Sequence, residues 1–564
     1  DMSRGLGDVY KRQSLTTSSL TVGAGTVTVN NHGNWTQSGG WSGNFNDWNN
    51  EAGASFTITS DLRVSDELFN AGLIQTSGAP GYYEYLTLTG DTTLVGGGEV
   101  ALNGSLSTVQ YSGGIPTLTN VDNVIRGQGL LNYLSLDNQA TLRAEGGTLR
   151  LYGTGGSNSG LFTADSTGTL QLAGVNSSFQ SLIDNASGHV SVASGGTLEL
   201  QSYATIAGGS VHGDTGSFLK GYGTLQDLTI TGELTFPEQT QSDLQLRGTI
   251  DNQGTLTAAP TPGYNAGFKV PGGYATTLSG GGDIVLDSQF YGKITGPGTL
   301  INTDNTIRGI GELRILGLDN QATIRAEGGE LRFYGFWGTN SGLLTTDATG
   351  TLILTGFNSS SPSLLDNTNG QVVIPNGGTL DLSNYATIAG GSVHGDTGSF
   401  LKGYGTLQDL TITGEFTFPE LTQSDLQLRG TIDNQGTLTA APTPGYYAGF
   451  KIGGYATTLS GGGDIVLDSQ FYGRITGPGT LVNADNTIRG IGELRSLNLD
   501  NRATIRAEGG ELRFYAFGGT NSGLLTTDDT GTLLLIGINQ NARSLLDNSA
   551  GQVVIPNGGT LDIS

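Results

Sequence analysis

The residues best suited to chemistry are histidines, serines and carboxylates that lie in repeated motifs. GSVHGDTG occurs twice, with His212 in the first copy and His394 in the second. Together with Ser210 and Asp214, the first copy holds the residue types of a nucleophile–base relay or a metal site. We expect neighbouring members of this set to alternate between the two faces of a strand, which prevents the relay geometry. One His and one Asp are also too few for a metal site, so the motif predicts a polar turn or an exposed strand position.

Paired carboxylates could serve in the cleavage of a polysaccharide, which needs two acids held across a cleft. The motif GGGDIVLDSQFYG holds Asp283 and Asp287 in one copy and Asp464 and Asp468 in the other. Members of each pair are four residues apart, so on a strand they share a face but lie two pleats apart. An earlier copy of the region has Glu99 and Asn103 instead. We therefore interpret these acids as solvated strand residues.

Three further kinds of motif could bind a ligand. The Arg-x-Glu sets are Arg143/Glu145/Arg150, Arg325/Glu327/Arg332 and Arg506/Glu508/Arg513. They could form a binding stripe, but we favour ion pairs with acids on neighbouring segments, each contributing under about 1 kcal/mol. Aromatic clusters at 34–48 and 332–338 could stack on sugars, although Trp337 becomes Gly518 in the next copy. The Asp-rich turn at 345–351 matches neither an EF-hand loop nor the nonapeptide calcium repeat.

These motifs recur because the chain itself is repetitive. NTIRGIGELR occurs at 305–314 and again at 486–495, with a looser version at 123–132. The offset between copies is 182 residues and becomes 181 late in the chain. We therefore expect three large units, with boundaries at 14–208, 209–390 and 391–564, of which the first is diverged and the last truncated. Residues 1–13 lack the repeat pattern and resemble adapter-derived read-through, so we exclude them from the fold.

A shorter period lies inside each unit. Leu331, Leu352 and Leu380 follow one another at 21 and 28 residues, each in a Gly-x-Leu-x-apolar segment. An asparagine lies about a dozen residues before each leucine, and the three are Asn320, Asn340 and Asn369. Segments of roughly this length, with short strands and Gly/Asn turns, are typical of a β-solenoid.

Comparison of the copies predicts which side chains lie in the core. Three equivalent segments read YLSL (133–136), ILGL (315–318) and SLNL (496–499). The two leucines are the same in every copy, whereas the residues before each of them change freely. This alternation predicts a strand with its leucines in the core and its variable residues facing water.

Composition excludes several classes of protein. The chain has 564 residues, of which 95 are Gly and none is Cys, and its net charge is −24. Disulfides, thiol nucleophiles and cysteine-ligated metals are therefore excluded. The acidity opposes binding to nucleic acid or to anionic lipid, and no apolar run is long enough for a membrane-spanning helix. We expect an all-β fold with no cofactor.

Three segments resemble the repeats of large bacterial β-solenoid proteins. They are LINTDNTIRGIGEL (300–313), LDNQATIRAEGGELRF (318–333) and GGTLDLSNYATIAGGSV (377–393). The similar families are filamentous-haemagglutinin-like adhesins and autotransporter passenger domains. The resemblance implies a right-handed parallel β-helix of pectin-lyase-like type, wound into an elongated rod. It also implies export from a Gram-negative-type bacterium to the medium or the outer cell surface.

We therefore expect a non-enzymatic stalk of an adhesin-like protein, acting by extended multivalent display. Its partners would be host-cell, glycan or neighbouring-cell surface receptors. We assign no catalytic or metal-binding residue from the sequence. One alternative is an exported polysaccharide lyase or glycoside hydrolase built on a β-helix, and another is a structural matrix or surface-layer component.

Overall fold

The structure is a computed structural model that describes residues 15–17, 28–37, 45–237, 242–289, 291–419, 424–516, 518–537 and 545–564. These residues form strands, turns and bends and contain no helix, so none of them could cross a membrane as an apolar helix. The excluded segment 1–13 lies outside the described residues. The chain forms two compact units, Asp1–Ile284 and Val285–Ser564.

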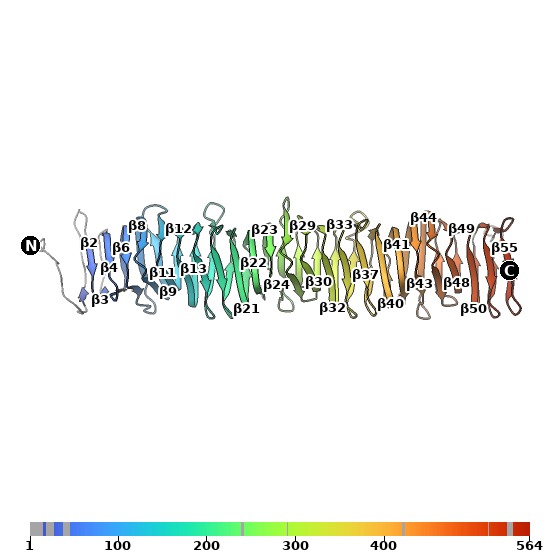
Figure 1. Ribbon diagram of the computed structural model, residues 1–564, viewed down its shortest axis with the longest axis horizontal. Coiled ribbons are helices and arrows are strands. Elements are labelled where there is room, and N and C mark those ends of the chain that lie inside the picture. The colour runs from blue at the N-terminus through green and yellow to red at the C-terminus, as the bar shows by residue number, and fades with distance from the viewer. Residues whose placement is uncertain are drawn as a thin grey trace, which may run out of the picture. The chain divides into compact units, whose positions relative to one another are not determined.

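Each unit is a stack of coils with three walls, and Figure 1 shows its strands side by side in chain order. In the first unit, the first wall includes β10 (Thr117–Asn120), β12 (Ser135–Asn138), β14 (Gly155–Asn158), β17 (Ser181–Asp184) and β20 (Ala204–Ala207). The second wall includes the first halves of β11 (Val124–Asn132) and β13 (Thr141–Tyr152), then β15 (Leu161–Ala164) and β18 (His189–Val192). The third wall includes the second halves of β11 and β13, then β16 (Thr169–Ala173) and β19 (Thr197–Leu200).

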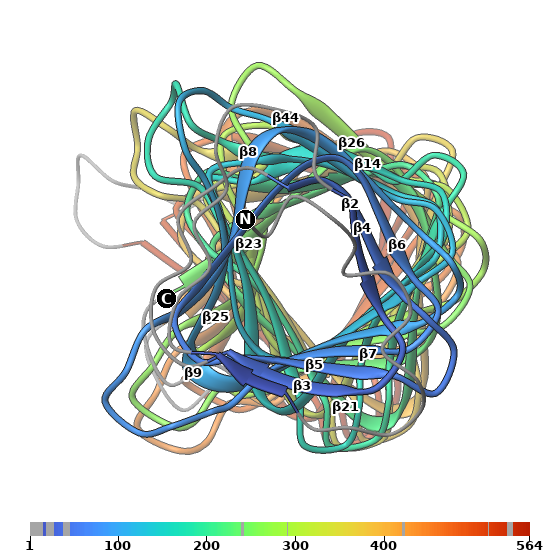
Figure 2. The ribbon, with the colours of Figure 1, turned by 90° about the vertical axis from the view of Figure 1, so that its left-hand side faces the viewer.

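Neighbouring strands within each wall pair in parallel. The view along the first unit in Figure 2 shows β2 (Thr28–Asn31) and β4 (Phe45–Asn50) on one side, with β3 (Asn34–Gln37), β5 (Ser55–Ile58) and β7 (Leu73–Thr76) on another. The second unit repeats the first wall with β29 (Thr299–Asn302), β31 (Gly317–Asn320), β33 (Trp337–Asn340), β36 (Ser363–Asp366) and β39 (Ala386–Ala389). The predicted all-β parallel solenoid is confirmed, and its right-handed winding stays a prediction.

Stacked leucines form the core, as the short period predicts. Leu331 pairs in register with Leu352, and Leu352 pairs with Leu380. All three side chains are fully buried. Because each coil places a leucine directly beside that of its neighbour, every added coil extends the same apolar column.

The predicted strand at 133–136 and its copies is only half correct. Its two leucines are buried in every copy, as expected. The strands, however, begin only at Ser135, Gly317 and Asn498. The first variable residue of each segment is in a left-handed turn, with φ of 51° at Tyr133, 51° at Ile315 and 55° at Ser496. The change of residue there reflects a corner of the coil and not the outer face of a strand.

The repeated decamer NTIRGIGELR covers most of two walls and the corner between them. Its two copies contain the whole of β30 (Thr306–Arg314) and of β48 (Thr487–Arg495). The register with the next coil shifts between Gly309 and Gly311, where the strand bends. Gly309 has φ of 108°, and a Cβ on Gly311 would lie 2.9 Å from that of Leu286. The two glycines are needed because the bend presses the backbone against the preceding coil.

Buried asparagines form a ladder at the corner between the first and second walls. Asn302 donates to Asn320 at 2.9 Å, and Asn320 donates to Asn340 at 2.7 Å. Asn340 donates in turn to Asn367 at 2.7 Å. The first unit has the same ladder, formed by Asn120, Asn138, Asn158 and Asn185. Of the three asparagines noted in the sequence, Asn320 and Asn340 belong to the ladder, whereas Asn369 is exposed in a turn and the ladder residue there is Asn367.

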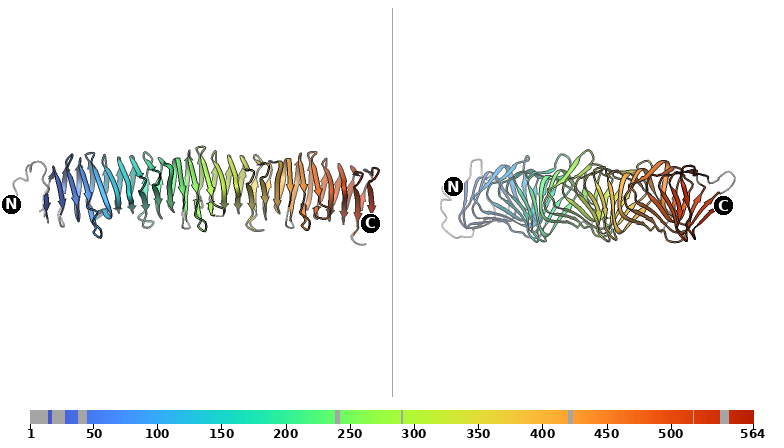
Figure 3. Two further views of the ribbon diagram at one scale, coloured as in Figure 1. Left: turned by 90° about the horizontal axis from the view of Figure 1, so that it is seen from below. Right: turned by 45° about the vertical axis from the view of Figure 1, so that its right-hand side comes forward.

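The long repeat does not contain a whole number of coils. Within the second unit, parallel pairing leads through Thr299, Gly317, Trp337, Leu364, Thr387, Thr406, Gln427, Lys451 and Thr476. These eight steps are eight coils. Thr480, the repeat counterpart of Thr299, follows four residues later on the next wall, where Leu481 pairs with Thr457. A repeat is therefore eight coils and one wall, and Figure 3 shows these coils from two more directions.

Candidate functional site: an aromatic corner

The histidine motif has part of the geometry that the sequence analysis excluded. The expectation that its members alternate faces is wrong for His212 and Asp214, whose Nε2 and Oδ1 lie 3.3 Å apart. Residues two apart on a strand share a face, so this contact is the normal one. Ser210 instead contacts Nδ1 of His189 at 2.7 Å, and the other nitrogen of His212 contacts Thr231 at 2.9 Å. The motif thus holds no serine–histidine contact of the kind that a relay needs.

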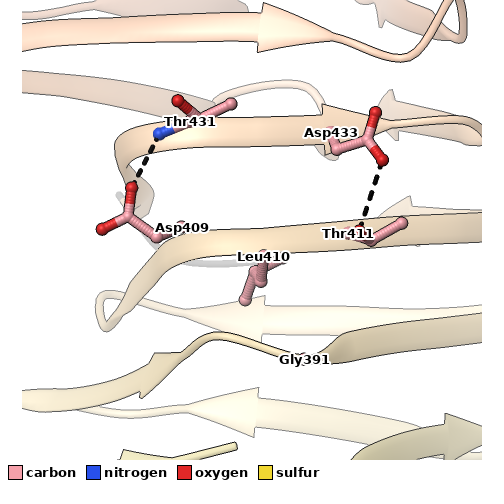
Figure 4. Close-up of a pocket in the computed structure, with 6 residues that line it drawn as sticks. All are labelled: Gly391, Asp409, Leu410, Thr411, Thr431 and Asp433. Atoms are coloured by element: carbon pink, nitrogen blue, oxygen red, sulfur yellow. Dashed lines mark hydrogen bonds between the residues drawn. The ribbon is translucent and has the colours of Figure 1, made fainter. Parts of the chain in front are cut away.

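One shallow hollow is lined by two acids, and both of them accept hydrogen bonds within the fold. This hollow of about 280 Å³ is shown in Figure 4. Asp409 accepts the backbone N–H of Thr431 at 2.9 Å, and Asp433 accepts the hydroxyl of Thr411 at 3.3 Å. The preceding repeat makes the same bonds with Asp227 and Asp251. Because they recur at equivalent corners, we assign these acids to turn formation and not to catalysis.

A second hollow, of about 250 Å³, lies beside the loop that follows β7. Glu84 is the one acid among the described residues that line it. Its carboxylate accepts hydrogen bonds from the hydroxyl of Ser77 and, at 2.9 Å, from the N–H of Gly78. Glu84 therefore anchors the loop. Asp464 and Asp468 do not form a facing pair of acids either, because the carboxylate of Asp464 forms an ion pair with Arg489 at 3.1 Å.

The Arg-x-Glu sets form ion pairs, but the expectation that their arginines pair with acids on neighbouring coils is wrong, because Arg143, Arg325 and Arg506 pair with the glutamate of their own strand. The pairs between coils come from arginines outside the sets. Arg126 contacts Glu99 on one neighbouring coil at 2.9 Å and Glu145 on the other at 2.5 Å. Arg143 contacts Glu145 from its own strand at 2.8 Å. The second and third repeats contain the equivalent pairs Arg308–Glu327 and Arg489–Glu508, each at 3.1 Å.

The Asp-rich turn at 345–351 uses its carboxylate internally. Asp347 accepts the N–H and hydroxyl of Thr349 at 2.8 and 3.0 Å, and the N–H of Gly328 at 2.9 Å. Burial raises the pKa of Asp347, but these hydrogen bonds outweigh it and hold the pKa below its usual value. Among the described residues, no group of three or more His, Asp or Glu side chains is placed to hold a metal ion.

The two predicted aromatic clusters divide between core and surface. Trp48 is fully buried against Phe56, with ring centroids 4.7 Å apart, so the expectation that it could stack on sugars is wrong. Phe336 is buried as well, whereas its neighbour Trp337 is half exposed. Trp41 lies outside the described residues.

A different group of aromatic rings gathers at the corner between the third and first walls. We call it the aromatic corner, and in the first repeat it consists of Tyr111, Tyr133, Tyr152, Phe179 and Tyr203. The ring centroid of Tyr133 lies 6.2 Å from Tyr111, 5.6 Å from Tyr152 and 5.6 Å from Phe179, each edge to face. Phe179 and Tyr203 are 39% and 52% exposed. These rings come from successive coils, so they line the corner along the stack.

The second repeat has an equivalent corner with different side chains. It consists of Ile315, Tyr334, Phe357 and Tyr385, and Trp337 lies next to it on the first wall. Tyr334 and Phe357 lie 5.7 Å apart, and Tyr385 is 51% exposed. In the third repeat, Ser496 takes the place of Tyr133 and Ile315, whereas Tyr515 keeps the ring of Tyr152 and Tyr334. The corner thus keeps its backbone path where one of its side chains changes.

The backbone of the aromatic corner is unusual for such large residues. Tyr133, Tyr203 and Tyr385 have φ of 51°, 59° and 60°, in the left-handed region that favours glycine. Bulky side chains are rare there because the Cβ crowds the backbone. Glycines on the adjoining coils make room for the rings. A Cβ on Gly153 would lie 2.9 Å from the ring of Tyr133, and one on Gly356 would lie 2.7 Å from Cβ of Tyr385.

An arginine lies against the aromatic corner, and the phenol of Tyr133 has a raised pKa. Burial raises the pKa of Tyr133, and the hydroxyls of Tyr152 and Tyr111 add to the rise, so its phenol stays neutral at physiological pH. Arg150 lies over the ring of Tyr152, with 4.5 Å from its Cζ to the centroid. Its repeat counterparts Arg332 and Arg513 pair with Glu330 and Glu511. Arg150 forms no ion pair with a described residue, and Thr148 stands in the acid's place.

Sequence reasoning missed the aromatic corner because its members are 19 to 27 residues apart and vary between repeats. A usable signal was present, namely a tyrosine or phenylalanine directly before the first wall in five consecutive coils. No family model, curated protein or solved structure matches the chain.

Proposed function

We propose that the chain is the stalk of a secreted or surface-displayed bacterial protein of adhesin type, acting by multivalent display and not by catalysis. The aromatic corner carries this proposal. It includes the exposed rings of Tyr111, Phe179 and Tyr203. The fold does not require a ring at every corner position, because Ser496 forms the turn that Tyr133 forms in the first repeat. Exposed aromatic groups of this extent mark a surface for binding.

The polar side chains of the described walls support binding over hydrolysis. Polysaccharide cleavage needs two acids facing each other across a cleft. The acids that line the two hollows accept hydrogen bonds from their own turns, and Asp464 is held in an ion pair. Equivalent acids recur in consecutive repeats, whereas an active site is normally built once. Multivalent binding, by contrast, becomes tighter with each repeated copy of a weak contact.

The test compares a single copy of the chain with many copies on one bead. Purified chain is applied to bacterial and epithelial cells, free in solution or coated on beads, and bound material is counted by flow cytometry. We expect beads to bind at least roughly a hundredfold more tightly than the free chain, as multivalent contacts require. Equal binding of beads carrying an unrelated solenoid would refute the proposal.

Two further assays separate the competing classes. Release of reducing ends or unsaturated uronates from plant and bacterial polysaccharides would show an enzyme. Concentration-dependent assembly into ordered arrays, measured by sedimentation without any ligand, would show a matrix component. The proposal expects neither activity, so either result contradicts it.

A further inference from the structure

We propose that Arg150, together with the rings beside it in the aromatic corner, binds the carboxylate of a small organic acid that has a flat, apolar body. The inference deepens the proposed function and rests on it, because it names the chemical class that the displayed surface binds. The carboxylate of the ligand takes the place of a glutamate that the second and third repeats supply from their own chain.

The two other repeats show how a carboxylate binds this arginine. A glutamate contacts Nη2 of the equivalent arginine at 3.2 Å in one repeat and at 2.6 Å in the other, in the pairs Glu330–Arg332 and Glu511–Arg513. Each glutamate lies two residues before its arginine, so both side chains project from the same face of the strand. In the first repeat, Thr148 holds this position before Arg150 and offers no carboxylate.

A second acid is missing from the coil that precedes Arg150. In the second repeat, Glu312 lies directly opposite Arg332 in the strand pairing, and the third repeat has a glutamate at the same place. In the first repeat, Leu130 lies opposite Arg150. Arg150 forms no hydrogen bond or ion pair with any described residue. Its guanidinium therefore lacks both of the carboxylates that lie beside its counterparts.

Stacking on an aromatic ring holds the guanidinium of Arg150 in position. Its Cζ lies 4.5 Å from the ring centroid of Tyr152. In the second repeat, Arg314 lies over the equivalent ring, and the first repeat has Asn132 in place of that arginine. A stacked guanidinium keeps its N–H groups free along its edge, where they can donate to both oxygens of a carboxylate. Because Arg150 is already held, binding costs little side-chain freedom.

The rings around Arg150 favour an acid with a flat, apolar body. The ring centroid of Tyr133 lies 5.6 Å from that of Tyr152 and 5.6 Å from that of Phe179. Phe179 and Tyr111 are 39% and 38% exposed, so these rings offer apolar surface to a ligand. A flat apolar group can lie against this surface while its carboxylate contacts Arg150. A small inorganic anion gains none of this contact.

The charge close to Arg150 is less negative than the net charge of the chain suggests. Over two coils on each side, the residues that pair in register with Arg150 are Thr108, Leu130, Gln171 and Glu199. The one acid among them, Glu199, lies two coils away and accepts a hydrogen bond from Gln171 at 2.7 Å. More distant acids are screened in about 0.15 M salt, where the Debye length is about 8 Å.

The test uses the whole chain in about 0.15 M salt and ligand-observed NMR, which detects weak binding of small molecules. Phenylacetate has both a carboxylate and a flat ring, 2-phenylethanol keeps the ring without the charge, and acetate keeps the charge without the ring. We expect saturable binding of phenylacetate with a Kd on the order of 1 mM, and at least roughly tenfold weaker binding of the other two. Binding of either of these as tight as that of phenylacetate, or no binding of phenylacetate, overturns the ligand class.

Substitutions at the exposed residue Thr148 locate the site without changing the arginine. Thr148→Glu supplies the acid that the other repeats have, so we expect it to pair with Arg150 and to weaken phenylacetate binding at least roughly tenfold. The matched control is Thr148→Gln, which has nearly the same size but no charge and should bind phenylacetate within about twofold of the parent chain. Equal binding by these two variants, or undiminished binding by Arg150→Met, overturns Arg150 as the site.

The outcomes separate this inference from the proposed function. If beads coated with Thr148→Glu bind cells as strongly as beads coated with the parent chain, display stands and this ligand class is overturned as its basis. If parent beads do not bind cells while phenylacetate binds the parent chain and not Thr148→Glu, the carboxylate site stands and cell adhesion fails.

Discussion

We expect the substitution Asn320→Ala in the buried ladder to destabilise the neighbouring coils by more than the loss of a single hydrogen bond. Asn320 is fully buried, and Asn320→Ala removes its side-chain amide from the middle of the ladder. The Oδ1 of Asn340 then loses the donor that lies 2.7 Å away. A buried acceptor left without a donor costs about 1–3 kcal/mol.

The substitution Asn320→Ala also removes two other hydrogen bonds, and each of these losses costs less stability. The amide of Asn302, 2.9 Å from Asn320, keeps its bond to the carbonyl of Asn305. The carbonyl of Ala322 loses the Asn320 amide at 3.0 Å but keeps the N–H of Leu343 at 2.8 Å. Each lost bond contributes about 0.5–1.5 kcal/mol, so the local loss of stability is at least about 2 kcal/mol.

Native-state hydrogen exchange by mass spectrometry measures this local effect, which is suitable because stacked coils need not unfold in one step. We expect amides in peptides spanning residues 317–346 to exchange at least roughly thirtyfold faster in Asn320→Ala than in the parent chain. The control is Asn369→Ala, whose side chain is exposed and outside the ladder. Similar exchange in the two variants would refute the role that we assign to the ladder.

Three other substitutions test separate features. Gly309→Ala should lower the thermal midpoint more than Gly328→Ala, because both have positive φ but only the Cβ at 309 would meet the Leu286 carbonyl; equal shifts would contradict the close packing of the bend. Hydrogen bonds from the hydroxyl and N–H of Thr368 hold the pKa of Asp366 below its usual value, so its stabilising effect is present above about pH 4 and is lost as pH falls through the folded-state pKa. The difference in thermal midpoint between the parent and Asp366→Asn should therefore shrink between pH 7 and about pH 2.5, and a constant difference would argue against that assignment. Arg126→Met removes ion pairs to Glu99 and Glu145 and should cost roughly 1 kcal/mol at low salt and less in about 1 M salt; a salt-independent loss would indicate packing instead.

The core could be predicted from the sequence because the chain provides its own comparison. Leucines that stay fixed while their neighbours change must share an environment, and Leu331, Leu352 and Leu380 indeed stack in register. The ladder was only partly predictable, since Asn367 and Asn369 are two residues apart and both precede Leu380. Only the path of the corner decides which of them turns inward.

The corners could not be predicted because their conformation contradicts local preference. Tyr133 and Ile315 adopt positive φ, which their side chains disfavour, so the pattern indicated a strand. The pairing of Ser210 with His189 was also hidden, because it joins two coils 21 residues apart. The aromatic corner combines both difficulties, since its residues are distant in sequence and its turns are atypical.

Each repeat contains one wall more than eight complete coils. This extra wall determines the direction in which equivalent side chains of successive repeats point. In the second unit, the counterpart of any side chain one repeat later points about a third of a circle away from the original. Thr299 and its counterpart Thr480, for example, lie on different walls and face different directions.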